Sequence, residues 1–339
     1  MRRAEAEAYR GRNVLITGGA GFIGSNLAHW LVSAGARVTI VDSLIPQYGG
    51  NLFNLAEIVD RVCLNIADIR DRSSMAYLVQ GRDVIFNLAG QTSHLDSMID
   101  PFTDLEINCT AQLSLLEACR HHNPDVVVVY ASTRQIYGKP QYLPVDERHL
   151  LQPTDVNGIN KMAGEWYHIL YHHVYDLKTV SLRLTNTYGP RMRVKDARQT
   201  FLGVWLRRVI EGEAIEVYGD GEQRRDFNFV DDVVEALLIA GRTGECYGRF
   251  FNLGSTEVVS LKELAELLID INGGGTYRLV PFPADRKRID IGDYYGDYRA
   301  FREATGWEPQ VRLREGLSRT LAFYRRHREQ YWKRDDSGG

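Results

Sequence analysis

The stretch "DVNGINKMAGE" at residues 155–165 contains two side chains whose types and spacing bear on proton chemistry. Asn157 and Lys161 are four positions apart, which places them on one face of a helix. A lysine transfers a proton near neutral pH when its surroundings lower its pKa. An amide has no usable proton equilibrium there, so Asn157 can orient a hydroxyl group or a water molecule but cannot act as a general base.

A histidine in the stretch "GQTSHLDSM" is a second candidate for proton transfer. An unperturbed imidazole titrates at about pH 6.5, which suits a general base, and we expect His94 on the loop after the fourth strand, at the border of the site. The alternative is a loop histidine with a structural hydrogen bond. Tyr137, Tyr142 and Tyr188 are further candidates for the base.

A glycine-rich loop, "TGGAGFIG", directly follows an apolar run near the start of the chain. Gly18 would make the tight turn, Gly21 would let a pyrophosphate approach the backbone, and Gly24 would allow close packing of the next helix. The following apolar run ends in Asp42, 18 positions beyond Gly24. A carboxylate there accepts a hydrogen bond from a ribose 2′-hydroxyl and repels a 2′-phosphate. The pattern predicts dinucleotide binding, with NAD favoured over NADP.

Apolar runs and helical patterns alternate through the first half of the chain. The runs are rich in Val, Ile and Leu without strict alternation, and they begin at residues 13, 36, 83, 125 and 179. Such runs are typical of strands buried on both faces, and their alternation with helices predicts a parallel sheet with right-handed crossovers. The expected fold class is therefore α/β, a doubly wound parallel sheet (Rossmann) with a smaller C-terminal α/β lobe.

Composition narrows the range of partners. The chain of 339 residues has 41 Lys and Arg against 44 Asp and Glu, a formal net charge of −3, and its dispersed basic residues disfavour nucleic-acid binding. No apolar run approaches the ~20 residues that span a bilayer, so we expect a cytoplasmic protein without a membrane partner. The cysteines lack a metal-binding spacing, which predicts no metal site, and we expect reduced thiols in or near the core: Cys63, Cys109, Cys119 and Cys246.

The motifs together resemble the extended short-chain dehydrogenase/reductase family, the NAD-dependent nucleotide-sugar epimerases and dehydratases. The resemblance covers nearly the whole chain. Beside the glycine loop it rests on "ADIRD" (67–71), "NLAG" (87–90), "STRQIYG" (132–138), "RLTNTYGP" (183–190), "GDGEQRRDFNFVDDVV" (219–234) and "GWEP…LREGL" (306–317). It implies an NAD-binding Rossmann domain over residues 11–185, with return segments near 226–256. It also implies a mainly substrate-binding lobe over 186–335, which ends in a polar tail, "KRDDSGG", expected to be frayed.

The resemblance implies a cofactor site around the glycine loop. Lys161 stands where the family's lysine holds the nicotinamide ribose, and Asp68 stands at the acid that contacts the adenine portion. The implied cofactor-binding residues are Gly18, Gly21, Phe22, Ile23, Gly24, Asp42, Asp68, Ile69, Leu88, Ala89 and Lys161.

The resemblance also implies a site for a nucleotide-diphosphate sugar. Thr133 stands where the family's serine or threonine hydrogen-bonds the sugar hydroxyl that is oxidised. Asn186 stands at the asparagine that contacts the diphosphate, and Arg225 at the arginine that neutralises it, with Arg288 or its neighbour Arg286 as a second phosphate clamp. The alternatives are surface salt bridges for the arginines and a capping role for Asn186.

The sequence departs from the family's pattern at Asn157, where the family has the tyrosine that removes the hydroxyl proton. Three explanations stay open. Another group is the base, either His94 or Lys161 with a water; or the protein binds NAD and a nucleotide sugar without turnover; or the chain carries an inactivating substitution. The catalytic candidates are Thr133, Asn157, Lys161 and His94.

The choice of reaction depends on the residues after Thr133. Dehydratases of the family have Thr-Asp-Glu there and decarboxylases have Thr-Ser-Glu, whereas this chain has Thr133, Arg134 and Gln135, so the acids are missing. Arg134 could bind a substrate carboxylate, but a salt bridge to Glu147 or Asp146 is the favoured interpretation. Epimerisation needs the fewest groups, and we interpret the chain as an NAD-dependent nucleotide-sugar epimerase. A dehydratase or decarboxylase, and a non-catalytic NAD/nucleotide-sugar binding protein, are the alternatives.

The helices expected around 104–122 and 160–175 carry apolar residues beyond one core stripe. The examples are Leu113, Leu116, Trp166, Ile169 and Leu170. Two such helices per subunit would form a four-helix bundle, the packing that the family resemblance implies, so we expect a homodimer.

Overall fold

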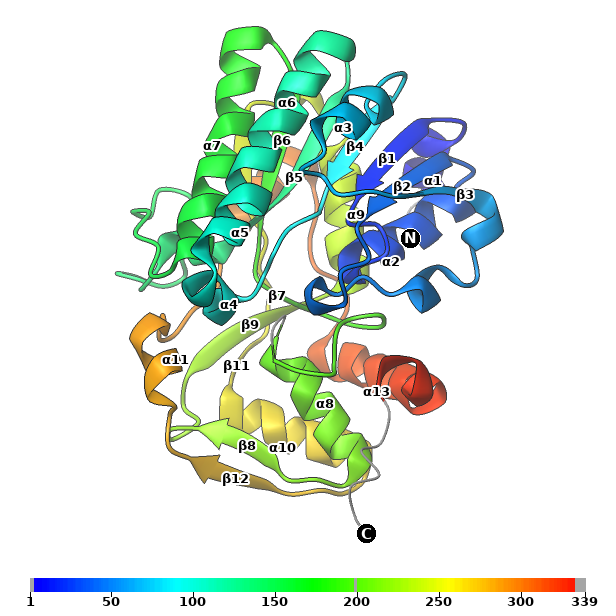
Figure 1. The fold of residues 1–339 in the computed structure, drawn as a ribbon. Coiled ribbons are helices and arrows are strands. Elements are labelled where there is room, and N and C mark those ends of the chain that lie inside the picture. The colour runs from blue at the N-terminus through cyan, green and yellow to red at the C-terminus, as the bar shows by residue number, and fades with distance from the viewer. Residues whose placement is uncertain (1–2, 198–199, 333–339) are drawn as a thin grey trace.

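The main domain is built on one parallel sheet of seven strands (Figure 1). The computed structural model describes residues 3–197 and 200–332, and the tail that was expected to be frayed, 333–339, lies outside them. The strand order is β10-β6-β5-β4-β1-β2-β3. The strands are β1 (Asn13–Thr17), β2 (Arg37–Asp42), β3 (Val62–Ile66), β4 (Val84–Asn87), β5 (Val127–Thr133), β6 (Lys178–Leu184) and β10 (Arg249–Asn252). The doubly wound fold is confirmed, and its order reverses between β1 and β4, where open α/β sheets bind ligands.

Helices cover both faces of this sheet because its strands are apolar on both faces. In β1, Val14 and Ile16 belong to one hydrophobic core and Leu15 to the other, as the period of two in a strand requires. One core lies under α1 (Arg3–Tyr9), α2 (Phe22–Ser33) and α9 (Val230–Ala240). The other lies under α3 (Arg72–Leu78), α6 (Ala111–His122) and α7 (Val156–Tyr175), which stand side by side in Figure 1.

A short, irregular helical segment leads from β4 into α6. It consists of α4 (His94–Ile99), α5 (Pro101–Leu105) and a π-helical turn over Glu106–Thr110. The structure thus begins a helix at His94 itself, where we expected a loop, because Ser93 caps this helix through its side chain. The segment packs against α7, so it faces the helix that carries Asn157 and Lys161.

The smaller lobe lies below the main sheet in Figure 1, with β7 and β9 at the junction. One sheet contains β7 (Asn186–Tyr188), β9 (Arg224–Phe229) and β11 (Val258–Ser260), and the other pairs β8 (Ile215–Tyr218) with β12 (Tyr277–Val280). Its helices are α8 (Phe201–Glu211), α10 (Leu261–Asn272), α11 (Ala284–Ile289) and α13 (Leu313–Tyr331). Between its strands the chain returns to the main domain as α9 and β10, and α12 (Arg299–Thr305) packs against β10.

All four cysteines are free. Cys119 and Cys246 are buried and Cys109 is half-buried, but Cys63 is exposed, so the expectation of a position in or near the core was wrong for Cys63. Its strand, β3, is an edge strand of the main sheet, and none of its residues is fully buried. Within the described part of the chain, every helix is too short or too polar to span a bilayer.

The outer face of α7 carries part of the apolar surface expected for a dimer. Leu116 and Ile169 are buried in the subunit, so both were wrong as examples of interface residues. Trp166 and Leu170 are 47% and 50% exposed, and Val174, one turn beyond Leu170, is also exposed. These three residues recur at intervals of four on α7 and form one apolar stripe.

We predict that the protein is a homodimer and that Leu170→Glu converts it to a monomer at micromolar concentration, because a charge on this stripe would have to be buried against its copy. Light scattering of both proteins checks the prediction. Leu279→Glu, at an exposed leucine of β12 in the smaller lobe, is the matched control and should stay dimeric. A wild-type chain that is monomeric under these conditions contradicts the prediction.

Candidate functional site

One cavity of about 660 Å³ lies where the carboxyl ends of the main sheet face the smaller lobe. Its volume is in the range of small-molecule sites. It brings together nearly all of the residues expected at the site: Gly18, Gly21, Phe22, Ile23, Gly24, Asp42, Asp68, Ile69, Leu88, Ala89, His94, Thr133, Arg134, Asn157, Lys161, Asn186 and Arg225.

Arg288 is the exception. It is exposed and does not line the cavity, whereas Arg286 does, with its guanidinium carbon 5.7 Å from the centre of the Tyr218 ring. Both arginines are on α11, and residues two apart on a helix point in nearly opposite directions. The second phosphate clamp is therefore Arg286 if either of the two serves, and Arg288 was the wrong choice.

The glycine loop packs backbone against backbone, which leaves the first turn of α2 open to a ligand. A Cβ atom at Gly24 would lie 2.3 Å from the Gly18 carbonyl oxygen, and one at Gly18 would lie 2.9 Å from Ala89 Cα. Gly21 is the N-cap of α2 and supplies no side-chain cap, so amide groups of the first turn keep their capacity to bind an anion. Loop and helix together fit the pyrophosphate of a dinucleotide.

Two carboxylates stand at the ends of β2 and β3, and both contact groups of the protein. Asp42 Oδ2 accepts a hydrogen bond from the Ala20 amide (3.0 Å) and Oδ1 accepts one from the Leu44 amide (2.8 Å), and burial raises the pKa of Asp42. Asp68 forms an ion pair with Arg70 (2.8 Å), and the hydrogen bonds from Arg70 lower the pKa of Asp68. Asp42 therefore ties the loop to β2 while it lines the cavity.

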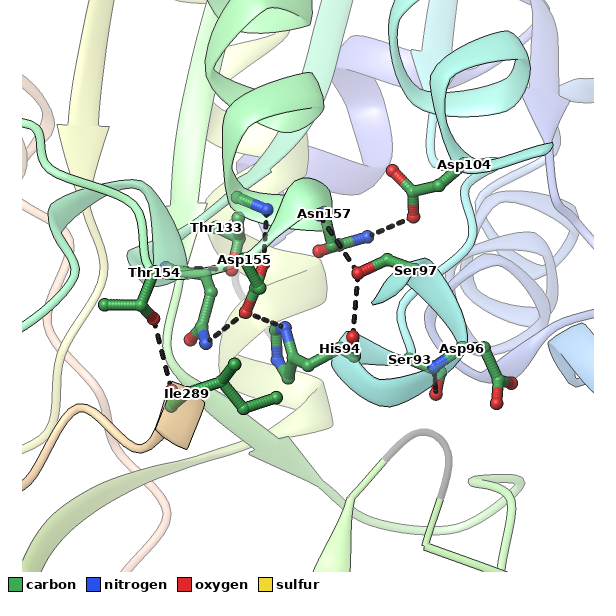
Figure 2. Close-up of polar contacts among 12 residues, drawn as sticks. Ser93, His94, Asp96, Ser97, Asp104, Thr133, Thr154, Asp155, Asn157 and Ile289 are labelled. Atoms are coloured by element: carbon green, nitrogen blue, oxygen red, sulfur yellow. Dashed lines mark hydrogen bonds and ion pairs between the residues drawn. The ribbon is translucent and has the colours of Figure 1, made fainter. Parts of the chain in front are cut away.

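Asn157 is held in a buried network around Asp104. Its Nδ2 donates to the Gln91 carbonyl oxygen (2.8 Å) and to Asp104 Oδ2 (3.0 Å), as Figure 2 shows in part. The fully buried Asp104 carboxylate also accepts from Asn108 Nδ2 (3.0 Å) and from Asn160 Nδ2 (2.8 Å). Both N–H groups of Asn157 are thus committed, and only its Oδ1 is left to contact a ligand.

His94 forms a pair with the buried carboxylate of Asp155 at the edge of the cavity (Figure 2). The distance from His94 Nδ1 to Asp155 Oδ2 is 3.0 Å. The same carboxylate accepts hydrogen bonds from the Gly158 amide (2.7 Å) and from Gln135 Nε2 (3.0 Å). Burial alone raises the pKa of Asp155, but these hydrogen bonds and the contact with His94 lower it overall. The contact has the distance of an ion pair without the geometry of a hydrogen bond, so Asp155 acts on the His94 ring through its charge. With the ring proton on Nδ1, Nε2 of a neutral ring is free to accept a proton.

The Asp155 and Asp104 carboxylates are the functional residues that sequence reasoning missed. Asp155 had a local signal, since an aspartate directly before a helix is a typical N-cap, and it caps α7. Asp104 had none, because its three amide partners come from α7 and the π-helical turn and meet it only in the folded chain.

Lys161 is buried and has few partners. Its Nζ donates to the Ala131 carbonyl oxygen at 3.3 Å and lies 5.1 Å from the centre of the Tyr130 ring. Burial lowers the pKa of Lys161 to about 8, against an opposing effect of the Asp104 charge. A side chain that reaches the cavity with one long hydrogen bond retains N–H donors for a bound ligand.

Two arginines line the cavity from opposite sides of the junction, Arg134 after β5 of the main sheet and Arg225 on β9 of the smaller lobe. Arg225 donates to the Arg224 carbonyl oxygen (3.0 Å) and to Gln223 Oε1 (3.2 Å), with the Asp290 carboxylate 3.8 Å away. Burial, followed by the nearby charge of Arg134, lowers the pKa of Arg225 to about 10. Two buried guanidinium groups that repel each other suit a ligand with several negative charges.

Arg134 does not form the salt bridge that we favoured from the sequence. Its Nη2 donates to Asn186 Oδ1 at 3.1 Å. The expected partners are engaged elsewhere, since Asp146 accepts from the Tyr142 hydroxyl and Glu147 from the Asn252 amide. The interpretation was wrong because Arg134 follows β5 at the carboxyl edge of the sheet and lines the cavity.

Known proteins match this chain over nearly its full length. The family model described as "Epimerase: NAD dependent epimerase/dehydratase family" matches residues 14–254. The UDP-glucose 4-epimerase of Mycolicibacterium smegmatis is 33% identical over 92% of this chain and 98% of its own. A dTDP-glucose 4,6-dehydratase of Actinoplanes sp. is 32% identical over 94% and 99%. The structure of the dTDP-glucose 4,6-dehydratase DesIV from Streptomyces venezuelae, with NAD and TYD bound, superposes with a TM-score of 0.86 at 27% identity over 95% and 99%.

We predict that the protein binds NAD at least ~10-fold more tightly than NADP, because the Asp42 carboxylate would face the 2′-phosphate. Calorimetric titration with both dinucleotides measures the ratio. Asp42→Asn keeps the size of the side chain and removes its charge, so it should lower the ratio of the dissociation constant of NADP to that of NAD. Equal or tighter binding of NADP to the wild-type chain contradicts the prediction.

The lowered pKa of Lys161 predicts a cost in stability. The folded protein has a pKa of about 8 for this lysine against 10.5 for the ordinary value, so burial of the ammonium destabilises the fold at pH 7 by up to about 3 kcal/mol. The cost shrinks as pH rises from about 8 towards 10.5, where the unfolded chain binds the extra proton. Lys161→Met should therefore be more stable than the wild type at pH 7, with a difference that decreases towards pH 10.

Urea denaturation at several pH values measures this difference, and calorimetry should show weaker NAD binding by the same variant. Lys139→Met, at an exposed lysine, is the control and should change the free energy of unfolding little at any pH. A Lys161→Met variant that is less stable than the wild type at pH 7 would show that the ammonium group stabilises the fold.

Proposed function

Because this chain belongs to the NAD dependent epimerase/dehydratase family, we propose that it is a nucleotide-sugar epimerase in which His94 takes the place of the family's tyrosine as acid–base group. NAD is the cofactor of the family and of this chain. The observation that carries the proposal is the His94–Asp155 pair at the cavity, at the start of the helix where Asn157 cannot transfer a proton.

The residues of the cavity suit both ligands. The first turn of α2 and the glycine loop would hold the cofactor's pyrophosphate, with Asp42 at the adenosine ribose and Lys161 at the nicotinamide ribose. Across the cavity, Arg225 and Asn186 would hold the diphosphate of the sugar nucleotide. When bound, NAD accepts a hydride from a sugar carbon and later returns it.

The protein groups then handle the proton. Thr133 would hydrogen-bond the sugar hydroxyl, and His94 Nε2 would accept its proton as the carbon is oxidised. The Asp155 carboxylate, whose pKa is lowered, keeps its charge at neutral pH and stabilises the imidazolium, much as an aspartate does in a catalytic triad. His94 would return the proton when the keto sugar is reduced on its other face.

Epimerisation fits the residues that follow Thr133. The resembling dehydratases have carboxylates at both of the next two positions and the decarboxylases have one at the second, whereas this chain has Arg134 and Gln135 there. The Gln135 side chain is buried and donates to Asp155, so it supports the acid–base pair and cannot itself accept a proton. The proposal assigns the sugar hydroxyl one acid–base group, His94, and a reversible oxidation needs only one.

We predict that His94→Ala lowers turnover by ~10²–10⁴-fold, the loss expected when a general acid–base is removed, and that Asn157→Ala lowers it less. Incubation with UDP- and dTDP-linked sugars, followed by NADH absorbance and by analysis of the sugar product, measures both. His122→Ala, at an exposed histidine on α6, is the control.

Two outcomes would redirect the assignment. If the native chain turns over and His94→Ala does not reduce the rate, Lys161 with a water becomes the base. If the native chain never oxidises a bound sugar and Asn157→Tyr creates that activity, the native protein is a binding protein.

A further inference from the structure

Arg134 lines the cavity and has a donor atom that no described group uses. Its Nη2 donates to Asn186 Oδ1, and its guanidinium carbon lies 5.0 Å from the centre of the Tyr294 ring. Its Nη1 is buried and has no hydrogen-bond partner among the described residues. Arg134 also forms no ion pair with any described residue. The guanidinium therefore presents free N–H groups on the wall of a ligand cavity.

Arg183, a structural arginine of the same protein, differs from Arg134 because its donors have partners. Arg183 is fully buried, whereas Arg134 is partly buried. Glu165 accepts from the Nε of Arg183 (3.0 and 3.1 Å) and also pairs with its Nη2, while Nη1 donates to the Tyr137 hydroxyl. A buried cationic donor without a partner is costly, and the expected remedy is an anionic acceptor. At Arg134 the carboxylates of Asp226, Asp290 and Asp155 act through their charge, but no described acceptor bonds Nη1, and a ligand anion can supply that acceptor.

The neighbours of Arg134 place this ligand group between the two ends of the substrate. On the side of the acid–base residues, Arg134 directly follows Thr133, and the negative charge of Asp155, the partner of His94, acts on its guanidinium. Towards the smaller lobe, its charge acts on Arg225, where the diphosphate would bind. The position between these groups is that of the sugar ring, provided that the ligand is the nucleotide sugar of the proposed function.

We propose that Arg134 binds a carboxylate carried by the sugar, so that the substrates of this protein are nucleotide-linked uronic acids. Both N–H groups of Nη1 and the second one of Nη2 are available, and a planar guanidinium presents such donors in the geometry that matches two carboxylate oxygens. The Tyr294 ring and Asn186 fix the plane of the guanidinium before the ligand arrives. The β-phosphate of the substrate offers the same anionic oxygens, and the experiment separates the two sources.

Calorimetric titration of the NAD-saturated protein with UDP-glucuronate, UDP-glucose and UDP, and with the corresponding dTDP compounds, tests the proposal. The wild type should bind the uronate at least ~10-fold more tightly than the glucose compound. Arg134→Gln should weaken binding of the uronate by ~10–100-fold, the value of a charge-assisted pair, and change binding of the other two ligands by less than ~3-fold. Arg225→Gln should weaken binding of all three by similar factors, and Arg82→Gln, outside the cavity, should weaken none.

Arg134→Lys keeps the positive charge but lacks the paired N–H donors of the guanidinium. It should bind the uronate more tightly than Arg134→Gln and less tightly than the wild type. Circular dichroism verifies that both variants are folded. An equal loss for all three ligands in Arg134→Gln would assign Arg134 to the diphosphate and overturn the proposal. So would a wild type that binds the glucose compound as tightly as the uronate. A uronate that binds through Arg134 but is never oxidised would instead overturn the epimerase function and leave the carboxylate site standing. If no nucleotide sugar binds in either series, both are overturned.

Discussion

The site depends on one buried carboxylate, that of Asp155. It caps α7 through the Gly158 amide, holds Gln135 at the end of β5 and pairs with His94 at the start of α4. Three segments that are far apart in the sequence therefore meet at two oxygen atoms. The helix that carries Lys161, the strand that carries Thr133 and the histidine that faces the cavity are positioned relative to one another by this single group. Loss of its charge would loosen all three at once.

A second carboxylate explains why an asparagine is tolerated where the family has a tyrosine. Asp104 is fully buried and accepts hydrogen bonds from Asn108, Asn157 and Asn160, and a buried carboxylate with this many donors does not need a counter-ion within bonding distance. An amide at position 157 thus has a structural role that a phenol with one O–H group cannot fill. The substitution belongs to a network, and the π-helical turn that carries Asn108 is part of the same arrangement.

The cavity brings together three cationic side chains that carboxylates of the protein compensate only in part. Lys161 and Arg225 have lowered pKa values because they are buried, and Arg134 keeps an open donor. Groups of this kind destabilise an empty protein and bind anions strongly, which is the usual relation between stability and function at a binding site. The ligands of the proposed function, NAD and a nucleotide sugar, carry two diphosphates, and the inferred sugar carboxylate adds a further negative charge.

The sequence by itself determined the parts of this protein that depend on local pattern. Buried strands and intervening helices have their own periodicity, so the doubly wound sheet was predictable from the apolar runs that begin at residues 13, 36, 83, 125 and 179. The glycine loop with Asp42 is a short-range motif, so the NAD-binding edge was predictable from it. Tertiary structure alone decided the polar contacts. Arg134 turned towards Asn186, 52 positions away, where a nearby acid had been expected, and Asn157 met Asp104 across 53 positions. Arg286 replaced Arg288 because α11 packs one of its faces against the cavity. Such choices depend on which long-range donors and acceptors are brought together on burial, and a linear pattern carries no record of them.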